Sequence, residues 1–168
     1  MERLNREILL AELTRDEGSK LKAYKDTMGF WTIGTGRNLD AMRRGARGIS
    51  LAETLQLRIT RATCLSKGIT NAQRMVLLDN DVSDCLKDLD QHLPWWRNLD
   101  GVRQRVLVNM CFNMGTGTLL TFKNTLSHIQ AGRYNDAAIG MLNSKWASQV
   151  HGRADRLATL MVQGESRG

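Results

Sequence analysis

The sequence predicts an α+β fold that is mostly helical, with a small β-containing lobe near the N-terminus and a larger helical lobe after it. Apolar side chains recur at helical spacing before residue 17 and again after residue 70. Between these regions, residues 21–37 hold β-favouring and apolar side chains that glycines interrupt. The length of 168 residues suits one domain over residues 1–168.

The elements before residue 70 differ in how clearly the sequence defines them. Apolar residues at helical spacing predict a helix over residues 3–16. Residues 21–37 predict a hairpin or small meander that turns near Asp26–Gly29. The segment 38–68 is basic and fits no single pattern, although Ser50 predicts the start of a helix at the next residue.

From residue 70 onward the chain is predicted to be almost entirely helical. Thr70 is expected to cap a long amphipathic helix that ends before Pro94. The buried stripe of this helix is expected to contain Met75, Leu78, Val82, Cys85, Leu86 and Leu89. Asp100 is expected to cap a largely buried helix that ends at Gly115. Shorter helices are predicted at about 117–121, 123–131, 134–143 and 152–162.

These elements set the expected limits of two lobes within the one domain. The N-terminal lobe covers about residues 15–70, and a long helix over about 70–92 joins it to the C-terminal lobe. The C-terminal helical lobe covers about residues 93–168 and packs with the helix at 3–16. A chain of this length can bury such a core without disulfide bonds.

The composition limits the classes of function. The odd number of cysteines and the wide spacing of the histidines argue against a disulfide framework or a metal site, so we expect no cofactor. No signal peptide or stretch of membrane-spanning length is visible, so we expect the protein to accumulate in the cytoplasm. The net charge of +7 favours polyanionic partners, which include nucleic acid, anionic lipid and the bacterial envelope.

Two carboxylates near the hairpin fit the chemistry of glycosidic bond cleavage. Glu17 ends the first predicted helix, and Asp26 follows in the hairpin. Such cleavage needs one carboxylic acid to protonate the leaving oxygen and a second carboxylate to activate water or attack the sugar. Thr32 has a hydroxyl that could orient a water molecule. Spacing alone also allows Glu17 to be a surface residue and Asp26 a turn former.

Blocks of sequence throughout the chain carry a resemblance to a known family. The first is Asp-Glu-Gly at 16–18 with Glu17, Asp26 and Thr32 in order, and it runs to Gly36. Further blocks lie at 109–117, 137–146 and 153–156. Together they resemble the T-even bacteriophage lysozymes over nearly the whole chain. The resemblance implies a lysozyme-like fold and hydrolysis of the β(1→4) bonds between N-acetylmuramic acid and N-acetylglucosamine in bacterial peptidoglycan.

The resemblance also implies roles for individual residues. Glu17 would be the general acid in a partly dehydrated cleft that favours its protonated form. Asp26 would be the ionised partner that helps a water molecule attack the anomeric carbon, and Thr32 would hold that water. The family outcome is inversion, for which the two carboxyl groups lie roughly 6.5–9.5 Å apart. The supporting or substrate-binding residues would be Arg153, which would pair with Glu17, and Phe112, Asn113 and Gly36.

The chain departs from this family at several positions. Arg37 stands where the T-even enzymes place a histidine, and its expected partner is Asp81. An arginine would keep this ion pair in a form that does not titrate near neutrality. Asn113 stands where the family often has glutamine, which weakens the case for a hydrogen bond to the sugar. The segment after Arg37 is longer and could contact an anionic surface through Arg43, Arg44, Arg47, Arg58 and Arg61.

Two other functions remain open at this point. A lytic transglycosylase uses one acid and leaves an anhydro ring, whereas the presence of both Asp26 and Thr32 favours hydrolysis. A basic helical protein that binds nucleic acid is the other alternative, but no recognition helix or stacking module stands out. We therefore expect a monomeric endolysin that acts on peptidoglycan. Anionic lipopolysaccharide is a second candidate partner, and nucleic acid is not an expected one. The endolysin would reach the periplasm through a separate pore-forming protein.

Overall fold

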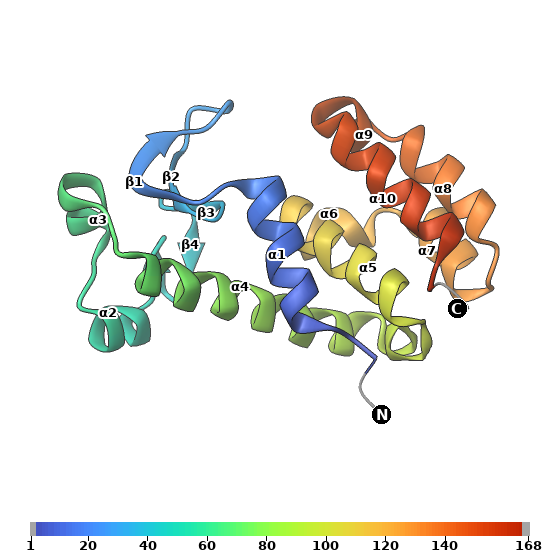
Figure 1. Ribbon diagram of the computed structural model, residues 1–168, viewed down its shortest axis with the longest axis horizontal. Helices are drawn as coiled ribbons and strands as arrows, with labels where there is room; N and C mark the ends of the chain where they lie inside the picture. Colours follow the sequence, from blue (N-terminus) through green and yellow to red (C-terminus); the bar gives the residue numbers. More distant parts are fainter. Residues whose placement is uncertain (1–2, 166–168) are drawn as a thin grey trace. The chain divides into compact units, whose positions relative to one another are not determined.

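The computed structural model describes residues 3–165 and confirms the α+β class (Figure 1). Two units make up the described chain: residues 10–81 form one, and residues 3–9 with 82–165 form the other. The boundaries between them fall inside two helices, α1 (Arg6–Glu17) and α4 (Asn71–His92). The unit of residues 10–81 is therefore one continuous stretch of chain, whereas the other unit combines two segments that are far apart in the sequence.

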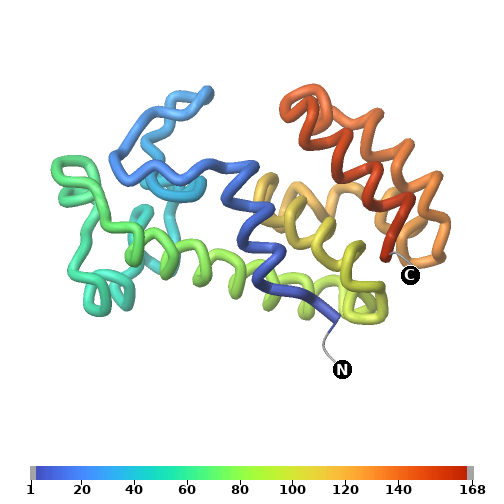
Figure 2. Tube along the Cα trace, in the orientation of Figure 1, coloured from blue at the N-terminus to red at the C-terminus, as the bar shows by residue number. Residues whose placement is uncertain are grey.

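The unit of residues 10–81 contains the strands. The chain passes from α1 directly into the first strand (Figure 2), and the bounds of the two elements leave two residues between them. Strands β1, β2 and β3 form one antiparallel sheet in that order, and β4 pairs with β5 in a second sheet. Their bounds are β1 (Lys20–Lys25), β2 (Trp31–Gly34), β3 (Arg37–Asn38), β4 (Met42–Arg43) and β5 (Ala46–Arg47).

The basic segment 38–68 is a structured part of this unit. After the β4–β5 hairpin it forms α2 (Leu51–Leu57) and α3 (Arg61–Lys67). Ser50 caps α2 as predicted: its hydroxyl accepts from the Glu53 amide, and the Glu53 carboxylate accepts from the Ser50 amide. The core beneath the segment is a cluster of buried apolar residues, namely Ile33, Leu39, Ile49, Ile59, Cys64, Ile69 and Leu77.

The helix α4 carries polar residues inside its buried stripe. Thr70 caps it as predicted, since its hydroxyl accepts from the Gln73 amide. The prediction that Met75 belongs to the stripe is wrong, because 41% of its surface is exposed. Arg74 and Asp81 take buried positions instead. The Arg74 guanidinium donates there to the Thr35 hydroxyl at 2.8 Å and to the Asn71 side chain at 2.9 Å, so a charged residue can take a buried position.

The other unit is helical around α5. Asp100 caps this helix, which ends at Gly115 as predicted, and most of its length is buried. The helices α8 and α10 pack side by side in this unit (Figure 1). Among residues 3–165, no helix is long and apolar enough to cross a membrane. The bounds in this unit are the 3₁₀ helix η1 (Pro94–Asn98), then α5 (Gly101–Met114), α6 (Thr116–Leu120), α7 (Lys123–Gln130), α8 (Tyr134–Leu142), α9 (Lys145–Val150) and α10 (Gly152–Gln163).

Candidate active site

Glu17 is the last residue of α1 and lies against the backbone at Gly36. The chain leaves the helix through Gly18, which has a φ of +87°. Gly36 lies in the tight connection between β2 and β3, with a φ of +75°. A Cβ atom built on Gly36 would lie 2.7 Å from Oε2 of Glu17 and 3.3 Å from its Cβ. The missing side chain of Gly36 therefore makes room for the Glu17 carboxyl group.

Asp26 fixes the turn that the sequence predicts between β1 and β2. Its Oδ1 accepts hydrogen bonds from the backbone amides of Met28 and Phe30, both at 2.9 Å. The backbone continues the hairpin, since the Asp26 amide donates to the Phe30 carbonyl and the Gly29 amide donates to the Asp26 carbonyl. One carboxylate oxygen thus orients the side chain, and Oδ2 is left to act as an acceptor.

Thr32 is 4% exposed and lies on β2, the strand that follows this turn. Its hydroxyl donates to the Phe30 carbonyl at 3.1 Å. Because that bond uses the hydroxyl proton, the lone pairs of Oγ1 remain available to accept a hydrogen bond. The next residue, Ile33, points into the apolar core, so strand alternation places Thr32 on the opposite face of the sheet.

The contact between Gly36 and Glu17 gives a first prediction. We expect Gly36→Ala to lower by about 10²-fold the rate of the hydrolysis that the resemblance implies, because the new methyl group would displace the Glu17 carboxyl group. The measurement is the initial rate on purified peptidoglycan. Gly45→Ala is the matched control, since Gly45 has a φ of +80° and no atom within 4 Å of a built Cβ. Equal rates for the two variants would contradict the prediction.

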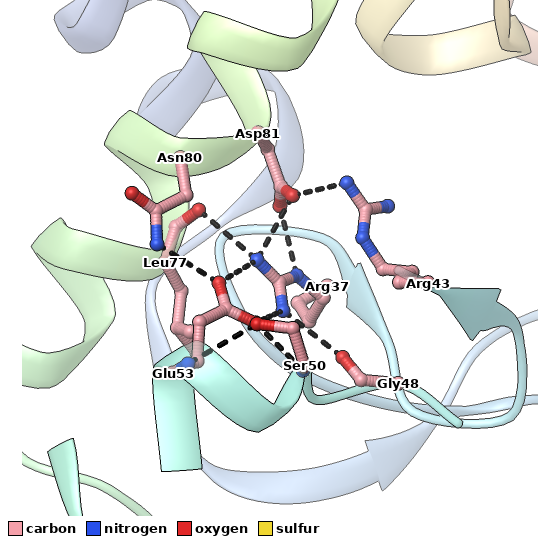
Figure 3. Close-up of polar contacts among 8 residues, drawn as sticks. All are labelled: Arg37, Arg43, Gly48, Ser50, Glu53, Leu77, Asn80 and Asp81. Atoms are coloured by element: carbon pink, nitrogen blue, oxygen red, sulfur yellow. Dashed lines mark hydrogen bonds and ion pairs between the residues drawn. The ribbon is translucent and has the colours of Figure 1, made fainter. Parts of the chain in front are cut away.

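Arg37 is the centre of a buried polar cluster (Figure 3). It is 2% exposed and binds two carboxylates in a bidentate manner. Its Nε and Nη2 donate to Asp81 at 3.0 and 2.9 Å, and its Nη1 and Nη2 donate to Glu53 at 2.8 Å each. Nη1 also donates to the Gly48 carbonyl, and Arg43 forms a further ion pair with Asp81. The guanidinium donors are thus largely satisfied within one unit.

Glu53 is a partner of Arg37 that could not be recognised from the spacing of charged residues alone. The available signal was the Ser50-x-x-Glu53 capping box, in which the glutamate turns back toward the start of α2. In the structure this orientation brings the carboxylate to Arg37 and also to the side-chain amide of Asn80 at 2.9 Å. The capping residue therefore also neutralises the buried cation.

These contacts shift the ionisation of both partners. Burial alone would lower the pKa of Arg37, but its hydrogen bonds and ion pairs with Glu53 and Asp81 outweigh burial and raise the pKa. Burial alone would raise the pKa of Glu53, but the hydrogen bonds and charge of Arg37 hold it well below the ordinary range. Both groups therefore stay charged at neutral pH.

The lowered pKa of Glu53 predicts acid sensitivity. A carboxyl group with a lowered folded-state pKa stabilises the fold above its unfolded pKa, about 4.3, and loses this contribution as the pH falls further. We expect the free energy of unfolding of the parental protein to fall below that pH and to fall less steeply in Glu53→Gln. Urea unfolding at a series of pH values measures this free energy, and Glu7→Gln, at an exposed glutamate, is the control. Parallel curves for the parental protein and Glu53→Gln would contradict the prediction.

Three predicted site residues belong to the other unit. Arg153, 7% exposed at the start of α10, donates from Nε to the Asn109 side chain at 2.9 Å. Asn113 accepts a hydrogen bond from the indole of Trp146 at 2.6 Å, so its side-chain oxygen already has a partner within the unit. Phe112 is half-buried on α5. Their contact with the substrate, and the pairing of Arg153 with Glu17, stay predictions.

Comparison with known proteins decides the family. The model of the family described as "Phage lysozyme" matches residues 14–162, a range that contains every predicted site residue. The chain belongs to the phage lysozyme family. As a member of this family it is an enzyme of the glycoside hydrolase class. Within residues 3–165, no group of three His, Cys, Asp or Glu side chains is arranged to hold a metal ion.

The relatives of this phage lysozyme family member include proteins named as lysozymes and a protein named as a phage spike protein. It is 33% identical over 156 residues to "Probable T4-type lysozyme 1" of Dictyostelium discoideum, covering 90% of this chain and 92% of that protein. It is 32% identical over 157 residues to "Pre-baseplate central spike protein Gp5" of Enterobacteria phage T4, covering 90% of this chain but 27% of that protein. "Probable T4-type lysozyme 2" of Dictyostelium discoideum is 29% identical over 160 residues.

Proposed function

We propose that this lysozyme hydrolyses the β(1→4) bond between N-acetylmuramic acid and N-acetylglucosamine in peptidoglycan, with Glu17 as general acid. The observation that carries the proposal is the hydrogen-bonding state of Asp26 and Thr32. Asp26 uses one carboxylate oxygen to bind the turn, and Thr32 uses its hydroxyl proton. Each side chain therefore keeps an acceptor for water. Family membership supports peptidoglycan as the substrate.

The two acceptors suggest how the attacking water is oriented. A water molecule can donate one hydrogen to Oδ2 of Asp26 and the other to Oγ1 of Thr32, which leaves a lone pair directed at the anomeric carbon. As the new C–O bond forms, Asp26 takes the proton. Glu17 donates its own proton to the leaving oxygen, so no charged leaving group is released. This sequence is a single displacement and inverts the anomeric carbon.

The stereochemistry of the product tests this mechanism. Proton NMR during the first minutes of hydrolysis should show the α-anomer of the new reducing end, because a β-linkage is inverted in one displacement. Initial formation of the β-anomer would instead require a covalent sugar intermediate and would exclude a single displacement by water.

The mass of the released muropeptides separates hydrolysis from the transglycosylase alternative. Hydrolysis adds one water to each cleaved bond, whereas a transglycosylase leaves an anhydro ring without that water. We expect hydrated products, since the bonds to the turn leave Asp26 and Thr32 each with an acceptor for water. Anhydro products would show that neither residue delivers water to the sugar.

We further propose that the enzyme is a monomeric endolysin that lyses the host cell after a separate pore-forming protein admits it to the wall. A domain of a virion spike is the second candidate, which the relative in phage T4 favours. Expression in a Gram-negative host should cause lysis with a pore-forming protein and not without it. Peptides of this chain in purified phage particles would favour the spike.

Three of the arginines that were expected to contact an anionic surface such as lipopolysaccharide have partners within the fold. Of the arginines in the segment 38–68, Arg43 pairs with Asp81, Arg47 donates to the Asp40 carbonyl, and Arg61 pairs with Asp40. These arginines therefore act within the fold. The support for an anionic surface as partner is the net charge of +7.

A further inference from the structure

Tyr24 lies on the same face of the hairpin as Asp26 and Thr32. In the β1–β2 ladder, Tyr24 is directly opposite Thr32. Residues in such pairs have Cβ atoms about 4.5–5.5 Å apart on one face of the sheet. Asp26 is two residues after Tyr24, and strand alternation brings it to that face as well. The opposite face packs on the apolar core through Ile33 and Ala23.

The charges of both proposed catalytic carboxylates act on the Tyr24 phenol. Partial burial raises the pKa of Tyr24, and the negative charges of Glu17 and Asp26 raise it further. The Lys20 ammonium group lies 4.4 Å from the ring centre and covers part of the ring. Because ionisation would place a third negative charge beside two carboxylates, the phenol keeps its proton and remains a donor.

The hydroxyl of Tyr24 is not used by the fold. In the described part of the chain, the turn engages Oδ1 of Asp26 and the hydroxyl proton of Thr32, but the Tyr24 hydroxyl takes part in no hydrogen bond. A half-buried phenol usually finds a partner for its hydroxyl. A ligand that occupies this face of the hairpin would supply one.

We propose that Tyr24 is a further substrate-contacting residue, whose hydroxyl donates a hydrogen bond to an oxygen of the saccharide beside Asp26 and Thr32. The inference rests on the proposed function, which places the saccharide at this face. Sugar hydroxyl, ring and acetamido oxygens all accept hydrogen bonds. A neutral donor also adds no charge that would compete with the separate protonation states of Glu17 and Asp26.

Removing the hydroxyl alone tests this contact. We expect Tyr24→Phe to lower kcat/KM on peptidoglycan fragments by about tenfold, the usual effect of losing one neutral hydrogen bond, with no change in Tm. Tyr134→Phe is the matched control, because the Tyr134 ring packs under the Arg103 guanidinium in the other unit. Tyr24→Phe with the kcat/KM of the parental enzyme would overturn the inference.

A titration tests the placement of Tyr24 without relying on activity. The chain has two tyrosines, so Tyr134→Phe leaves Tyr24 as the single phenol. Its ultraviolet titration should have a midpoint above the ordinary value of about 10. Adding Glu17→Gln or Asp26→Asn should lower that midpoint. A midpoint that neither substitution moves would show that the carboxylates do not face Tyr24.

The two experiments separate the failure of this inference from the failure of the proposed function. If Glu17→Gln and Asp26→Asn abolish hydrolysis while Tyr24→Phe retains full kcat/KM, the contact with Tyr24 is wrong and the carboxylate mechanism stands. If Glu17→Gln or Asp26→Asn retains full activity, the carboxylate mechanism of the proposed function is wrong, whatever the effect of Tyr24→Phe.

Discussion

Glu17→Gln is expected to reduce cell-wall hydrolysis by about 10²–10⁴-fold, the range attributed to a general acid. Glutamine has nearly the same shape as glutamate and still fits beside Gly36, but its amide cannot protonate a leaving oxygen. The turbidity loss of chloroform-treated Gram-negative cells measures the effect.

The control for this variant is Glu7→Gln, at an exposed glutamate near the start of α1, which should have parental activity. Circular dichroism and Tm should show that both variants are folded. A purified, folded Glu17→Gln protein that clears cell walls at close to the parental rate would remove Glu17 from the mechanism.

Arg37→Met is expected to have the largest effect on stability, a loss of about 3–5 kcal/mol in the free energy of unfolding. Glu53 and Asp81 are 2% and 6% exposed, so both would remain buried after losing their main cation. Arg43 still contacts Asp81 and compensates in part. Urea unfolding at neutral pH measures the loss, and exposed Arg47 supplies the control, Arg47→Met, with an expected change within about 1 kcal/mol.

Neutral partners should recover part of this stability. In the triple variant Arg37→Met, Glu53→Gln, Asp81→Asn, no buried carboxylate remains without a cation. We expect it to be more stable than Arg37→Met alone. A triple variant that is less stable would mean that packing around the arginine stem, and not charge compensation, explains the loss.

Helix starts with polar caps could be predicted from the sequence. Ser50, Thr70 and Asp100 each precede an apolar run, and each caps a helix in the structure. The turn at Asp26–Gly29 was equally clear, because a turn-forming aspartate and a glycine lie between two β-favouring runs. In each case the determining interaction lies within a few residues along the chain.

Several short elements could not be predicted, although the helix expected at about 117–121 is present as α6. The helices α3 and α9 have seven and six residues, which is less than two turns and too few for a clear apolar period. The strands β4 and β5 have two residues each, so no alternation is visible. Their hairpin depends on a turn in which Arg44 and Gly45 both have positive φ angles.

Long-range polar contacts limited the prediction of the site and of α4. The pattern of apolar residues suggested Met75 as buried, whereas the structure buries Arg74, whose partner Thr35 is 39 positions away. The close approach of Gly36 to Glu17 also depends on tertiary packing. The order of Glu17, Asp26 and Thr32 was available from the resemblance, and their catalytic roles stay predictions.

The double use of Asp26 has a practical consequence for engineering. One oxygen of this side chain organises the local backbone, and the other remains available as an acceptor. Asp26→Ala would remove the acceptor that holds the turn together with the proposed catalytic group. Loss of activity in this variant would therefore not show which of the two roles matters. Asparagine preserves the oxygen that accepts from the backbone and exchanges only the other oxygen for a nitrogen donor. Libraries that vary this hairpin should therefore retain a planar side chain with an acceptor at this position.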